Sequence, residues 1–357
     1  MLLDEHDVSP AETGQVVGHT AARHTPADHY RLCRIGYSHD RRSHVTPCPQ
    51  DRNGLNVGQR ESRMPDVIEL VSDWAGRPVR QTPIKGGLSH LIAKVETGDG
   101  ERWLLRVLDP AVCSAGLGIP MEQEIENTVR AADTGVGPKV IHHFPEVHAL
   151  LIEYLDGVTL NAAQVPRHLD AIATACRTLH AGPRFVNDFS IFDKLRDFRR
   201  LCRTNGLATP PGYDDILPTV ADIERAMPAI PTVPCHNDLL AENFIAQGDE
   251  IRIVDYQLSG NNDPAFELGD IAAEADLDPD QTARLARAYF TTGEHDSRVR
   301  LFHIMSNVTW TLWFSVHHGL LDRQADFDYA AEAAGKFARA VRDLDGVGRL
   351  IDDVRRH

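Results

Sequence analysis

The stretch from His236 to Asp255 constrains this chain more than any other part of its sequence. It begins His-Asn-Asp-Leu-Leu-Ala-Glu-Asn, and after a polar turn an apolar run, 251–254, ends in Asp255. Phosphoryl transfer to a hydroxyl needs one carboxylate to accept the proton, and an amide oxygen and a second carboxylate to hold Mg²⁺ against nucleotide phosphates. The spacing H-x-D-x4-N, followed by a strand that ends in Asp, supplies these groups. It predicts Asp238 as the catalytic base, and Asn243 and Asp255 as metal ligands.

Each of these residues alone has a simpler interpretation, because Asp and Asn favour turns through side-chain hydrogen bonds to the backbone. The complete spacing is not explained by that preference. A hairpin is also predicted between residues 243 and 254, and it would bring Asn243 and Asp255 to one place. His236 and Asp270 are expected to brace the predicted catalytic loop, residues 236–243.

Length, charge and cysteine usage limit the class of protein. The chain has 357 residues, enough for two lobes, and its net charge of -15 argues against nucleic acid as a partner. No apolar run reaches the length of about 18 residues that a membrane-spanning helix needs. The cysteines form no C-x-x-C pair and indicate reduced thiols of a cytoplasmic protein. Oligomeric state is left open by the sequence.

The chain divides into three predicted regions. Residues 1–64 have few large apolar side chains and no regular period, so we expect a disordered extension. Residues 65–155 predict an ATP-binding lobe, and residues 156–357 predict a catalytic and substrate-binding lobe.

The predicted elements indicate an α+β class with a two-lobed, protein-kinase-like fold. The first lobe has strands on both sides of a glycine turn, one main helix and two further strands, which form a small antiparallel sheet. The second lobe is mostly helical. Its predicted helices cover 165–180, 193–204, 213–227, 264–275, 279–292, 299–319 and 326–344.

Nucleotide-binding groups are predicted along the first lobe. Gly86 and Gly87, with Ser89, would let the backbone approach phosphate oxygens, although a Gly-Gly pair is also common in plain turns. Arg106 lies in the third strand, where a cation would contact the α- and β-phosphates.

A glutamate of the following helix should position Arg106. Glu124 is the first choice, and Glu122 and Glu126 are the alternatives. The end of the last strand, Glu153 to Leu155, is predicted to meet the adenine edge through its backbone.

Together these motifs resemble the choline kinase and aminoglycoside phosphotransferase superfamily, and its choline/ethanolamine kinase branch most. The resemblance covers residues 66 to 345. It is carried by Gly86-Gly87-Leu88-Ser89, Leu104–Val107, Cys235–Asn243, and the run from Asp255 through Asn261–Asp270. It implies ATP and Mg²⁺ as cofactors, and a small, cationic alcohol as acceptor.

The resemblance also implies an acceptor pocket. Trp310 and Trp313 lie three residues apart, on one helix face, and could contact a quaternary ammonium by cation–π interaction. Tyr329 would form a further aromatic wall. An acidic group, Asp263 or Glu274, would hold the cationic end of the acceptor.

Several residues depart from the family pattern. Gln257 and Leu258 replace an acid and an aromatic that many choline kinases have after the metal-binding Asp, and His90 stands where Asn is frequent. These departures leave the acceptor open. The alternatives are an aminoglycoside-type antibiotic kinase and, from another class, a pseudokinase that binds nucleotide as a regulatory module.

Overall fold

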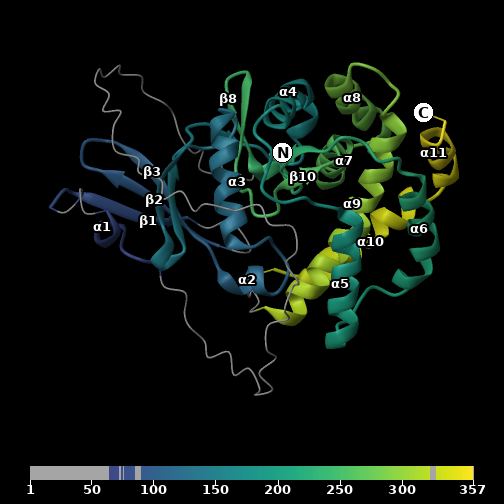
Figure 1. Ribbon diagram of the computed structural model, residues 1–357, viewed down its shortest axis with the longest axis horizontal. Helices are drawn as coiled ribbons and strands as arrows, with labels where there is room; N and C mark the ends of the chain where they lie inside the picture. The colour runs from purple at the N-terminus through teal and green to yellow at the C-terminus, as the bar shows by residue number, and fades with distance from the viewer. Residues whose placement is uncertain (1–63, 72–73, 75, 85–89, 322–326, 357) are drawn as a thin grey trace, which may run out of the picture. The chain divides into compact units, whose positions relative to one another are not determined.

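The computed structural model describes residues 64–71, 74, 76–84, 90–321 and 327–356. The predicted extension, apart from Met64, therefore lies outside the described residues. Gly86, Gly87 and Ser89 of the predicted phosphate-binding turn also lie outside them. Figure 1 shows a strand-rich part followed along the chain by a mainly helical part, as the sequence predicts.

A five-stranded antiparallel sheet forms the first part. Its spatial order is β1-β2-β3-β5-β4, with β1 Val79–Ile84, β2 Leu91–Thr97, β3 Arg102–Val107, β4 Val140–Phe144 and β5 Ala149–Glu153. In β2 every second side chain from Ala93 to Thr97 is buried, which is the alternation of a strand with one face on a core. Trp74 and Val67 pack into this core.

In the described part of this region, three helices accompany the sheet: α1 Val67–Leu70, α2 Pro110–Ser114 and α3 Met121–Asp133. Helix α2 is capped by Asp109 and has Pro110 at its first position. The face of α3 that is buried includes Glu124, whose carboxylate is fully enclosed. A charge at such a position requires a partner.

Among the residues that the structure describes, eight helices build the second part. They are α4 Leu169–His180, α5 Ile191–Asn205, α6 Leu217–Ala226, α7 Pro264–Glu274, α8 Pro279–Phe290, α9 Asp296–Leu320, α10 Tyr329–Asp343 and α11 Val347–Val354. Helix α9 is buried along most of its length and packs against α5, α7 and α10. Within the described ranges, no helix is long and apolar enough to cross a membrane.

Short strands hold the loops of the second part. β7 Val233–Cys235 pairs with β10 Gly260–Asn262, and β6 Val158–Thr159, β8 Phe244–Gln247 and β9 Glu250–Ile253 form a second small sheet. The pairing of β8 with β9 is the hairpin that the sequence predicts between Asn243 and Asp255. The two sheets position the segment between β7 and β8 and the segment between β9 and β10.

Candidate active site

The segment from His236 to Asn243 is fastened to the end of β9. The backbone N–H of Val254 donates to the carbonyl oxygen of Asn243 at 3.0 Å, and Nε2 of His236 lies 2.9 Å from the carbonyl oxygen of Val254. Nδ2 of Asn243 donates to the carbonyl oxygen of Asp238 at 2.8 Å. The contacts bring together the catalytic loop, Asn243 and Asp255.

Two residues of this site have left-handed backbone conformations. Asn237 has φ 68° and Asp255 has φ 72°. Such conformations cost about 1–3 kcal/mol for a non-glycine residue unless local contacts hold them. Nδ2 of Asn237 donates to the carbonyl oxygens of Leu258 and Gly260, at 3.1 and 3.2 Å. Asp255 is held by an ion pair with Arg106.

Asp238 has a carboxylate suited to accept a proton. No described residue donates a hydrogen bond to it. Burial raises its pKa well above its usual range, and the neighbouring carboxylates of Asp270, Glu274 and Asp255 raise it further, while Lys336 opposes the rise. A base with a raised pKa takes a proton more readily than an ordinary carboxylate.

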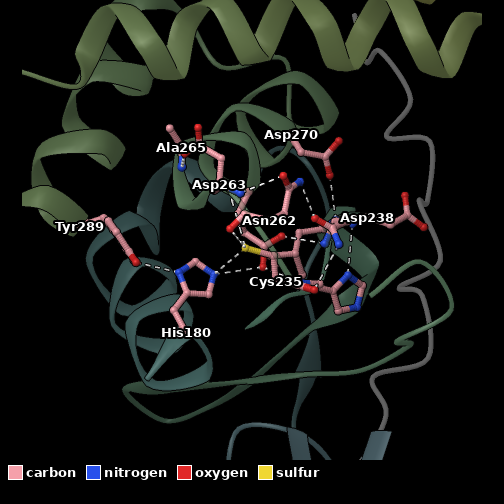
Figure 2. Close-up of polar contacts among 12 residues, drawn as sticks. His180, Cys235, Asp238, Asn262, Asp263, Ala265, Asp270 and Tyr289 are labelled. Atoms are coloured by element: carbon pink, nitrogen blue, oxygen red, sulfur yellow. Dashed lines mark hydrogen bonds and ion pairs between the residues drawn. The ribbon is translucent and has the colours of Figure 1, made fainter. Parts of the chain in front are cut away.

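Four acidic residues follow one stripe of α7 beneath the catalytic loop, at the spacing i, i+4, i+7 and i+11. Asp263 caps the helix and pairs with Arg298, and Glu274 at the other end pairs with Lys336. Figure 2 shows Asp263, Asp270 and Asp238 in this region. The two middle members, Glu267 and Asp270, bind the catalytic loop itself.

Glu267 anchors the start of the loop. Its two carboxylate oxygens accept the backbone N–H groups of His236 and Asn237, each at 2.7 Å, and Nε2 of His180 lies 3.4 Å from the first oxygen. Burial would raise its pKa, but His180 and the backbone donors lower it below its usual value. The fully buried carboxylate therefore fixes the backbone immediately before Asp238.

Asp270 anchors the loop on the other side of Asp238. One oxygen accepts the backbone N–H of Leu239 at 2.9 Å, and the other accepts Oγ of Ser306 and Nε1 of Trp310, both at 2.8 Å. Burial and the charge of Glu274 raise its pKa to about 7. The indole N–H of Trp310 is thus bonded to the group that positions the loop.

Arg106 joins the sheet to Asp255, the predicted metal ligand. It pairs with Asp255, and with Oε1 of Glu124 at 2.9 Å. Oε2 of Glu124 lies 3.6 Å from Nε2 of His90. Of the three candidate glutamates, Glu124 is the one that the structure places against Arg106; Glu126 pairs with Arg130 at 3.0 Å.

Replacing Glu124 by glutamine should raise the KM for ATP about tenfold or more, because Arg106 would lose the charge that orients it. The KM for the acceptor should stay near that of the unchanged chain. Steady-state kinetics with ATP as the varied substrate measure this. Glu126→Gln, on the same helix but exposed, is the matched control, and an equal effect of both changes would contradict the assignment.

The remaining predicted groups lie in different places. Oε2 of Glu153 accepts the backbone N–H of Lys139 and pairs with Arg252, both at 3.1 Å, while Leu155 is buried. Both oxygens of Asp263 are engaged, by the N-terminus of α7 and by Arg298, so this carboxylate is not available to a ligand near Trp310.

An aromatic cluster extends from Trp313 along α9 to the start of α10. The ring centroid of Trp313 lies 4.8 Å from that of His317, whose ring stacks on Tyr329 at 4.6 Å and 12°. Phe314 and Phe327 complete the cluster. Two of the three predicted aromatic residues, Trp313 and Tyr329, therefore share one cluster, while Trp310 contacts Asp270 and Phe198.

Gln257 and Leu258, the two departures from the family pattern, make structural contacts. The carbonyl oxygen of Gln257 accepts the backbone N–H of Ile119 at 3.2 Å, and Leu258 is a core residue whose carbonyl oxygen binds Asn237. Their main-chain groups link the loop after Asp255 to the segment before α3 and to the catalytic loop.

Sequence reasoning missed Glu267 and Lys336. Glu267 could have been found from the four-residue spacing of acids along α7, which puts it on the face of Asp263 and Asp270. Lys336 lies in the apolar stripe of α10, and a charged residue at such a position indicates a buried charge with a partner. The partner of each one is distant in sequence, so neither interaction could be predicted.

The donor set near Asp238 suits Mg²⁺. Oδ1 of Asn243 receives no hydrogen bond within the described ranges, and the second oxygen of Asp255 is not used by Arg106. Hard oxygen ligands of this kind are those that Mg²⁺ prefers. A separate group of ligand-type atoms, His180, Cys235 and Glu267, already bonds internally and to the backbone.

Known relatives match over the region that contains this site. The model of the "Phosphotransferase enzyme family" matches residues 80–302. Protein LicA of Haemophilus influenzae is 30% identical over 181 residues, covering 48% of this chain and 63% of LicA. Ethanolamine kinase 2 of Rattus norvegicus is 27% identical, covering 57% of this chain and 55% of that protein. The chain thus spans less than two thirds of these relatives.

Solved structures agree in fold. A choline/ethanolamine kinase family protein of Mesorhizobium loti has a TM-score of 0.69 and 27% identity, covering 81% of this chain and 97% of that one. Aminoglycoside phosphotransferase APH(4)-Ia, with a TM-score of 0.57 and 16% identity, covers 78% of this chain and 97% of its own. The protein-kinase-like fold that the sequence predicts is confirmed. The chain belongs to the phosphotransferase enzyme family.

Proposed function

We propose that this chain is an ATP- and Mg²⁺-dependent kinase that phosphorylates the hydroxyl of a small, cationic alcohol such as choline or ethanolamine. The observation that carries the proposal is the meeting of Asp238, Asn243 and Asp255 through the contacts of the catalytic loop with Val254. Arg106 and Glu124 add the charge pair expected beside nucleotide phosphates.

The proposed reaction assigns one task to each group. Asp238 accepts the proton of the acceptor hydroxyl. The hydroxyl oxygen then bonds to the γ-phosphorus, and the bond from that phosphorus to the bridging oxygen of ADP breaks. Arg106 binds phosphate oxygens and offsets their charge. Asn243 and Asp255 would hold Mg²⁺, which neutralises phosphate charge when bound. Glu267 and Asp270 keep the loop in place.

The acceptor assignment rests on the aromatic cluster and on the relatives. Trp313 is half-buried and offers a ring face for an ammonium group, and Tyr329 packs in the same cluster. The carboxylate of Glu274 is paired with Lys336. The matched proteins include an ethanolamine kinase and thiamine kinases of Salmonella, which are named for small cationic alcohols. An aminoglycoside kinase would instead need an acidic cleft for several ammonium groups.

A panel assay of ADP release tests the proposal. The chain is incubated with ATP, Mg²⁺ and each of choline, ethanolamine, thiamine and kanamycin, and ADP is measured against a sample without acceptor. We expect stimulation by at least one of the first three. Stimulation by kanamycin alone would favour the antibiotic kinase, and ATP binding without any stimulation would favour the pseudokinase.

A further inference from the structure

Lys336 occupies a position of α10 at which the helical pattern predicts a buried apolar side chain. The buried residues of α10 are Tyr329, Ala333, Lys336 and Ala340, at the spacing of a single core-facing stripe. Lys336 is only 4% exposed. A charged side chain in such a place costs several kcal/mol unless it is paired, and a well-packed apolar residue would often be at least as stable.

The partner of Lys336 is the last acid of the α7 stripe. Its Nζ donates to Oε1 of Glu274 at 2.6 Å, and the side chain of Glu274 is 9% exposed. Glu274 lies one turn beyond Asp270, which binds the backbone of the residue after Asp238. The charges of both Lys336 and Glu274 act on Asp238. The pair is therefore part of the surroundings of the base.

The packing of α10 on α9 fixes the position of Lys336 along α9. His303 contacts Asp343 at 3.4 Å, and His317 stacks on Tyr329, so the two helices run antiparallel. In this register Lys336 comes level with Trp310, whose indole N–H binds Asp270. Trp310 and Glu274 are both predicted members of the acceptor pocket, so Lys336 lies where that pocket is expected.

We propose that Lys336 is a specificity-determining residue, which supplies a fixed positive charge to the acceptor pocket and limits the charge of the acceptor. The proposal rests on the proposed function and narrows its acceptor class. Because Lys336 already offsets Glu274, one positive charge on the acceptor contributes little to binding, and several are repelled. The pocket then suits small alcohols with at most one positive charge, and it excludes polycations such as aminoglycosides.

Two acceptors of equal shape but different charge separate the effect of charge from the effect of shape. Choline and its neutral carbon isostere, 3,3-dimethylbutan-1-ol, are compared by kcat/KM in the unchanged chain, in Lys336→Met, in Glu274→Gln and in the double variant. Arg342→Met removes an exposed cation from the same helix and is the matched control. Thermal unfolding and ATP binding report whether each variant folds.

The preference for choline over its isostere should be less than about tenfold in the unchanged chain. It should rise by about tenfold in Lys336→Met, fall by a similar factor in Glu274→Gln, and return toward the original value in the double variant. A structural ion pair alone would lower both rates equally and leave this ratio unchanged. Arg342→Met should also leave it unchanged.

Two other outcomes are decisive. A preference of the unchanged chain for choline over its isostere of more than about a hundredfold would overturn the role of Lys336. So would folded single variants with the same ratio of kcat/KM values as the unchanged chain. In both cases the kinase function stands. If the unchanged chain binds ATP but phosphorylates neither alcohol nor any acceptor of the panel, the proposed function fails and this inference falls with it. If one of the single variants does not fold, the test is made by comparing the other single variant with the unchanged chain.

Discussion

Alanine in place of Asp238 is expected to lower kcat by about a thousandfold or more, because the acceptor hydroxyl loses its proton acceptor. ATP binding should remain nearly intact, since no phosphate-binding group of the sheet is changed. Steady-state ADP release gives kcat, and titration calorimetry with a non-hydrolysable nucleotide gives the affinity. Asp249→Ala, an exposed acid in the turn between β8 and β9, should leave both near their original values.

Retention of a tenth of the activity by Asp238→Ala would contradict its assignment as the base. Loss of ATP binding together with activity would show a general disturbance of the loop. The variant Asp238→Asn keeps the shape of the side chain and should be as inactive as the alanine variant, because the amide cannot accept the proton.

Glu267→Ala is the change with the largest expected effect on stability. It would leave the backbone N–H groups of His236 and Asn237 without their acceptor inside the core, and His180 without its carboxylate. We expect the free energy of unfolding to fall by about 3–5 kcal/mol. Activity should fall as well, because the backbone before Asp238 is no longer fixed. Urea denaturation measures the first effect and ADP release the second.

Glu242→Ala is the control for this change, because Glu242 is exposed in the same loop. It should alter the free energy of unfolding by less than about 0.5 kcal/mol. A loss below about 1 kcal/mol for Glu267→Ala would contradict the account of Glu267 as the anchor of the catalytic loop.

Local patterns in the sequence predicted much of the fold. The short strands of the first lobe and the helical spacing of α3 are properties of neighbouring residues, so they could be recognised without tertiary information. The spacing of the predicted site could be recognised for the same reason, since Asp238 and Asn243 lie on one loop and the hairpin to Asp255 is short.

Contacts between distant segments could not be predicted in the same way. Lys336 and Glu274 are 62 residues apart, and their pairing depends on how α7 and α10 each pack against α9. The spacing of Trp310 and Trp313 did place both on α9, but only the packing shows that the indole N–H of Trp310 binds Asp270. Such partners are set by tertiary packing, which periodicity alone does not specify.

The proposed kinase moves a phosphoryl group from ATP to the hydroxyl of a small alcohol. Phosphorus NMR of a reaction with ATP, Mg²⁺ and choline or ethanolamine tests it most directly, because it identifies the acceptor oxygen. We predict a new phosphomonoester signal that grows as ADP forms, and its absence with Asp238→Asn. ADP accompanied only by inorganic phosphate, or a phosphomonoester that forms equally with Asp238→Asn, would contradict the claim.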